Sequence, residues 1–66
     1  MQITVNGAPR ELPEGSSAAV LIESMGLAGK RYAMEINREI LPRSEHAVHR
    51  LQPGDQVEIV QAIGGG

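Results

Sequence analysis

The chain has no cysteine, no tryptophan and no phenylalanine, and it has a single tyrosine among its 66 residues. Without cysteine, disulfide bonds and thiolate metal sites are excluded, and nothing depends on an oxidising compartment. Because aromatic side chains are nearly absent, a core has to be built from Ile, Leu, Val, Met and Ala. A single domain of this length buries only about 60% of the surface that its unfolded form exposes, which leaves little room for an internal active site.

Long apolar runs and an excess of basic residues are also missing. No run approaches the roughly 20 apolar residues that a membrane-spanning helix needs, and the segment Met1–Val5 lacks the basic region of a secretion signal. Six basic against eight acidic residues give a formal net charge of −2, whereas nucleic-acid binding needs a basic stripe. We therefore expect a cytoplasmic domain that is monomeric when free and has neither a membrane nor a nucleic acid as its partner.

Apolar and polar residues alternate near both ends and in the middle of the chain, which is typical of half-buried strands. The residues that this alternation places on the buried faces are Ile3 and Val5, then Tyr32, Met34 and Ile36, then Val57 and Ile59. On the last strand, Glu58 and Val60 fall on the opposite face. We therefore expect three main strands.

The first strand is followed by a turn. Asn6-Gly7 is a strong hairpin signal, and because Ala8-Pro9 come directly after it, a loop longer than two residues remains an alternative. Arg10–Leu12 is expected to return as a short edge strand, since Pro9 lacks the N–H that a central strand needs.

A helix is expected from Ser17 to Leu27. Ser16 or Ser17 can cap its start by accepting a backbone hydrogen bond, and Gly26 can take the left-handed conformation that ends it. The apolar stripe with helical spacing consists of Ala18, Leu21, Ile22 and Met25.

The second half of the chain contains shorter elements. Asn37–Glu39 is expected to turn the chain into a brief strand at Ile40-Leu41, and Ser44 to cap a single helical turn through Glu45–His46–Ala47–Val48. Asp55 follows Pro-Gly and is expected to accept a turn hydrogen bond. The whole order predicts an α+β fold, with one main helix packed across a small mixed sheet of four to five strands.

Three consecutive glycines, Gly64, Gly65 and Gly66, come after the last predicted strand. Glycine gives up more conformational freedom on ordering than any other residue, so we expect a folded domain over residues 1–63 and a flexible glycine tail over 64–66. Such a tail has no Cβ to clash inside a narrow channel, and it can carry a terminal carboxylate to a partner's active site. A frayed end and a cloning remnant are the alternatives.

His46 and His49 are three residues apart and close to Glu45. They offer two nitrogen ligands, fewer than the three or four protein ligands of a zinc site. We therefore predict a solvated pair in a polar turn and no metal site.

Several motifs together resemble the ThiS family of bacterial sulfur carriers in thiazole biosynthesis. The matching residues are Asn37, Leu41-Pro42-Arg43, His49, Gly54-Asp55 and the terminal Gly65-Gly66. The similarity spans the whole chain, and Gly64 extends the family's usual glycine pair to three. The resemblance implies a ubiquitin-like β-grasp fold.

The resemblance also implies a function and partners. The Gly66 carboxylate would be adenylated with ATP and Mg²⁺ by an E1-like enzyme (ThiF type) and converted to a thiocarboxylate. The sulfur would come from a donor such as a cysteine desulfurase or a rhodanese-like persulfide enzyme, and it would pass to thiazole synthase (ThiG type). The chain would bind no cofactor itself.

The residues of a catalyst are not evident in the sequence, which contains neither a phosphate-binding glycine loop ending in Lys-Ser or Lys-Thr nor a cysteine to carry persulfide. We therefore expect a carrier acted on by enzymes, not an enzyme. Val60 and Ala62, on the outward face of the last strand, are predicted to form part of the surface that docks on the adenylating enzyme. The alternatives are the small sulfur-carrier subunit of molybdopterin synthase, a ubiquitin-like modifier that forms isopeptides, and an interaction module with an inert tail.

Overall fold

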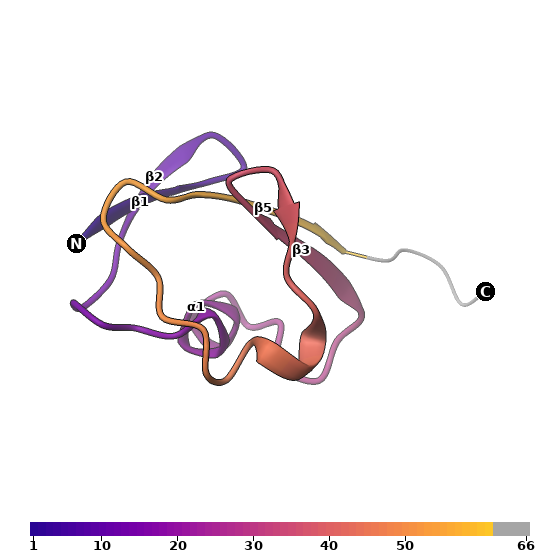
Figure 1. The fold of residues 1–66 in the computed structure, drawn as a ribbon. Helices are drawn as coiled ribbons and strands as arrows, with labels where there is room; N and C mark the ends of the chain where they lie inside the picture. The colour runs from indigo at the N-terminus through magenta and orange to yellow at the C-terminus, as the bar shows by residue number, and fades with distance from the viewer. Residues whose placement is uncertain (62–66) are drawn as a thin grey trace.

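The computed structural model describes residues 1–61, in which one five-stranded sheet has the order β2-β1-β5-β3-β4. The strands are β1 (Gln2–Val5), β2 (Ala8–Glu11), β3 (Tyr32–Ile36), β4 (Glu39–Ile40) and β5 (Gln56–Gln61). β1 and β5 are parallel, and the other neighbours are antiparallel. The helix α1 (Ala18–Ser24) lies on one side of this sheet (Figure 1). The expected α+β fold with a mixed sheet is confirmed, and the predicted boundary between residues 63 and 64 lies outside the described part.

The core lies between α1 and the sheet. Its buried apolar side chains are Ile3, Val5, Leu12, Ala18, Leu21, Ile22, Met34, Ile36, Leu51, Val57 and Ile59. Both periodicities in the sequence therefore point to the correct faces, since alternate strand residues and the helical stripe supply most of this set. Within residues 1–61, no helix is both long enough and apolar enough to cross a membrane.

The first hairpin has a two-residue loop. Asn6 and Gly7 have φ angles of 51° and 83°, and Val5 pairs directly with Ala8. Two successive positive φ angles are what a tight hairpin turn with the right-handed twist of its strands requires. The longer loop is thus excluded, and the return strand begins at Ala8 instead of Arg10. β2 lies at the edge of the sheet, as predicted, and it includes Pro9, which was expected before the strand.

The predicted caps of α1 are confirmed. The Ser17 hydroxyl accepts a hydrogen bond from the Val20 N–H at 3.3 Å, and Gly26 ends the helix with φ of 72°. The Leu27 N–H then donates to the Ile22 carbonyl at 3.0 Å, a bond typical of a helix that ends at a left-handed glycine.

The predicted helical turn after β4 is wrong in its start and its cap. A 3₁₀-helix covers Arg43–Glu45, its N-cap is Pro42, and no side chain caps it, so Ser44 has no capping role. Pro42 has φ of −58° and ψ of 145°, an extended conformation from which the turn begins at the next residue. The brief strand is likewise Glu39–Ile40, one residue earlier than expected.

Candidate functional site

The last strand, β5, carries the residues that precede the predicted glycine tail. It lies in the middle of the sheet, between β1 and β3 (Figure 1). Within β5, the side chains of Val57 and Ile59 are buried in the core, whereas Val60 is 69% exposed. Gln61, the last described residue, pairs with Tyr32 at the start of β3. The predicted tail, Gly64, Gly65 and Gly66, lies outside the described residues.

The outward position of Val60 is confirmed, since its side chain points away from the core and pairs across the sheet with Ala33. Its predicted partner on the docking surface, Ala62, falls outside residues 1–61. A docking role for the two residues therefore remains a prediction.

The side chain of Asn6 holds the second half of β5. Its Oδ1 accepts a hydrogen bond from the Ile59 N–H at 2.8 Å, and its Nδ2 donates to the Ile59 carbonyl at 3.2 Å. Because β1 ends at Val5, this amide takes the place of the next strand residue and satisfies both backbone groups. The sequence showed Asn6 as a turn residue only, and nothing in a hairpin signal reveals a contact 53 positions away.

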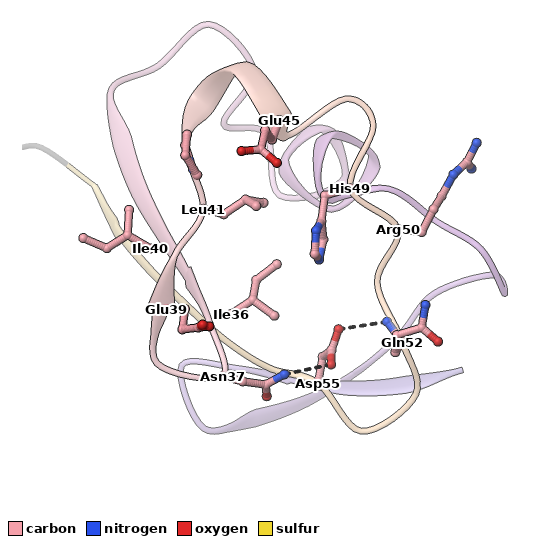
Figure 2. A pocket seen from close by; sticks show the side chains of 11 residues that line it. Ile36, Asn37, Glu39, Ile40, Leu41, Glu45, His49, Arg50, Gln52 and Asp55 are labelled. Carbon is pink, nitrogen blue, oxygen red and sulfur yellow. Dashed lines mark hydrogen bonds between the residues drawn. The ribbon is translucent and has the colours of Figure 1, made fainter.

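Five of the described residues that carry the family resemblance line a hollow of about 530 Å³ at the other end of β5 (Figure 2). The hollow is lined by Asn37, Leu41, Pro42, His49 and Asp55. Ile36 and charged residues of both signs also contribute to the lining. In Figure 2 His49 points into this hollow, while Ile40 points away from it.

Asn37 and Asp55 in this hollow have a structural role. The Asp55 carboxylate is buried and accepts from the Asn37 amide at 3.1 Å and from the Gln52 N–H at 2.8 Å. Asn37 Oδ1 in turn accepts from the Gln56 N–H at 3.0 Å. The turn hydrogen bond predicted for Asp55 is thus confirmed, and the pair connects the β3–β4 turn to the start of β5.

The prediction of a solvated histidine pair is wrong for His46, whose surface is only 5% exposed. Its Nδ1 is 2.8 Å from the Tyr32 hydroxyl, and its Nε2 is 3.0 Å from the Leu41 carbonyl. The reason is the earlier start of the helical turn, which directs position 46 inwards. Within residues 1–61, no three His, Cys, Asp or Glu side chains form a group that could hold a metal ion.

Arg43 also contacts the Tyr32 ring. The Arg43 guanidinium carbon is 4.3 Å from the centroid of the Tyr32 ring, and an Arg43 N–H donates to the Lys30 carbonyl at 2.7 Å. Because Tyr32 pairs with Gln61, these contacts lie next to the last described residue of β5.

Comparison with known proteins decides the family. The family model described as "ThiS family" matches residues 3–66. The chain belongs to the ThiS family. The sulfur carrier protein ThiS of Escherichia coli is 35% identical over 66 residues, which cover all of both chains. The crystal structure of the thiamine biosynthesis protein ThiS from Geobacter metallireducens matches over the full length of both chains, with a TM-score of 0.83 and 30% identity. The ubiquitin-like β-grasp fold is therefore confirmed.

A second kind of relative is much longer than this ThiS-family chain. The thiazole synthases of Paramagnetospirillum magneticum and Magnetococcus marinus are each 35% identical to it over 66 residues. All of the chain is covered, but it spans only a fifth of the length of these relatives. Each of these thiazole synthases thus contains a segment similar to the whole chain.

Proposed function

We propose that this ThiS-family chain is the sulfur carrier of thiamine biosynthesis and that the Gly66 carboxylate is its reacting group. The observation that carries this proposal is the end-to-end match with a protein named as a sulfur carrier. In addition, the two thiazole synthases contain a ThiS-like segment. A carrier and the enzyme that receives its cargo have to meet, and a shared polypeptide keeps them close.

The chemistry explains why a partner must activate the terminus. A carboxylate is a poor electrophile because its charge is delocalised and oxide would have to leave. Transfer of MgATP's adenylyl group to a carboxylate oxygen releases pyrophosphate and creates AMP as a leaving group. The terminal sulfur of a donor persulfide then attacks the acyl carbon, and AMP departs. A thiol cleaves the resulting sulfur–sulfur bond, which leaves the thiocarboxylate on Gly66.

Catalysis in this scheme belongs to the partners, and the chain itself is a protein cosubstrate. The E1-like enzyme supplies the ATP site, a persulfide enzyme supplies sulfur, and thiazole synthase accepts it from the carrier. We place these exchanges in the cytoplasm. The named relatives favour this thiazole branch over a molybdopterin synthase subunit and over an isopeptide-forming modifier.

Intact mass after reaction tests the proposal. The chain is incubated with a cell extract of its own organism that supports thiamine synthesis, together with MgATP and a persulfide donor. A shift equal to the replacement of one oxygen by sulfur supports the carrier role, and it should vanish when Gly64, Gly65 and Gly66 are deleted together. Covalent conjugates with larger proteins would instead indicate a modifier. An unchanged mass, in an extract that supports thiamine synthesis, would refute the proposal.

A further inference from the structure

The face of the sheet opposite α1 has an unusual centre. Paired residues lie directly opposite each other and share a face, and on this face Ile40 is opposite Glu35, Glu35 is opposite Glu58, and Ala33 is opposite Val60. These five residues, which we call the outer patch, span β4, β3 and β5. Two carboxylates, Glu35 and Glu58, are therefore direct neighbours across the sheet within the outer patch.

The two carboxylates are not neutralised by the chain. Like charges directly opposite on a sheet destabilise it, and Glu is a poor strand residue. Within residues 1–61, the structure shows no ion pair or side-chain hydrogen bond to Glu35 or Glu58. Arg38 lines the same shallow hollow as Glu58 without pairing with it. The remaining residues, 62–66, contain no basic side chain, so the pair is available to a cation from outside.

The surroundings of the pair indicate which cation fits. Ile40 and Val60 are 76% and 69% exposed, and with Ala33 they place apolar surface on either side of the carboxylates. A planar guanidinium can donate to two carboxylates at once and loses less hydration than an ammonium. Apolar contacts around such an ion pair exclude water, which strengthens the ion pair. Arginine is also enriched among the residues that contribute most to the binding energy of protein interfaces.

We propose that the outer patch binds an arginine on an apolar surface of the adenylating enzyme, with the guanidinium between Glu35 and Glu58. This proposal rests on the proposed function, because it takes the enzyme that acts on Gly66 as the occupant. The chain also limits where that arginine lies. Gly66 is six positions after Val60, so the docked patch lies at most about 20 Å from the enzyme's ATP site.

Steady-state adenylation tests the proposal. The double variant Glu35→Gln with Glu58→Gln keeps the size of both side chains and removes both charges. At saturating MgATP, with pyrophosphate release as the readout, we expect the KM for the carrier to rise about tenfold or more, while kcat is unchanged. Thermal unfolding of the free variant should occur no lower than in the wild type, because the repulsion is gone.

The matched control is Glu14→Gln with Glu23→Gln, which removes the same net charge from exposed positions off the outer patch. Its KM should equal that of the wild type. An equal KM rise in both double variants would mean that the enzyme is attracted by the carrier's overall negative charge. No rise in either variant would mean that the enzyme does not contact Glu35 and Glu58. Both results overturn the proposal. If the wild type itself is not adenylated by an active enzyme, the proposed function fails and this inference falls with it.

Discussion

The substitution Val60→Asp separates a docking role from a role in the fold. Val60 is 69% exposed and pairs with the exposed Ala33, so a carboxylate at this position stays in water. Surface changes of this kind usually alter the free energy of unfolding by less than about 1 kcal/mol. We therefore expect the free domain to keep its thermal unfolding temperature within a few degrees.

The expected loss in docking is larger. Burying a valine side chain fully contributes about 1.5–3 kcal/mol, and most of the Val60 surface is available for burial because it is 69% exposed. The removed contact is thus roughly 1–2 kcal/mol. A new carboxylate would also be desolvated in the interface, next to Glu58. Since 1.4 kcal/mol is about a factor of ten, the KM of the adenylating enzyme for the carrier should rise about 10- to 100-fold.

The assay is pyrophosphate release at saturating MgATP, with the unfolding temperature measured on the same samples. Val48→Asp is the matched control, because Val48 is 70% exposed but lies in the connection before β5, away from the outer patch. A KM rise of the same size in the Val48 variant would refute the reasoning. A large loss of thermal stability in the Val60 variant would show that Val60 belongs to the core.

Three further predictions follow from the hydrogen bonds and from the tail. Asn37→Gly keeps the positive φ of 52° but removes the amide that contacts Asp55. We expect urea unfolding to show that the free energy of unfolding falls by about 1–3 kcal/mol. An unchanged free energy of unfolding would mean that the turn is stable without this amide. Tyr32→Phe deprives buried His46 of its hydroxyl partner, and thermal melts should show a cost of about 1–2 kcal/mol. One extra residue after Gly66, with no protease to remove it, should abolish thiocarboxylate formation in intact-mass measurements; undiminished sulfur delivery would contradict the carrier mechanism.

The features that could be predicted from the sequence are those that depend on neighbouring residues. Alternation at Ile3 and Val5 and the helical stripe through Leu21 and Ile22 are periodic, and all four side chains are buried. Capping by Ser17 is equally local, because the hydroxyl reaches an N–H three residues away.

Side chains that contact distant segments could not be predicted in the same way. The bonds from Asn6 to Ile59 depend on β5 lying beside β1. The opposition of Glu35 and Glu58 depends on the register of two strands that are 20 or more residues apart, and a shift by one position would have placed each beside a different residue. His46 shows that a prediction from neighbouring residues can also be wrong. The helical turn begins at Arg43 instead of Glu45, and the His46 side chain is buried instead of solvated.

The central position of β5 matters for the proposed carrier, whose terminus partner enzymes would hold. A channel that bound the tail would pull on Gln61 along the strand. That pull is opposed on one side by the pairing of β5 with β3 from Tyr32 to Ile36, and on the other by β1 and the Asn6 amide. Backbone hydrogen bonds on both sides would have to yield together, because they cross the direction of the pull. An edge strand would resist with one side only. The fold therefore suits a tail that partners would hold tightly while the domain stays folded, and it places Val60 of the outer patch beside Gln61, the last described residue.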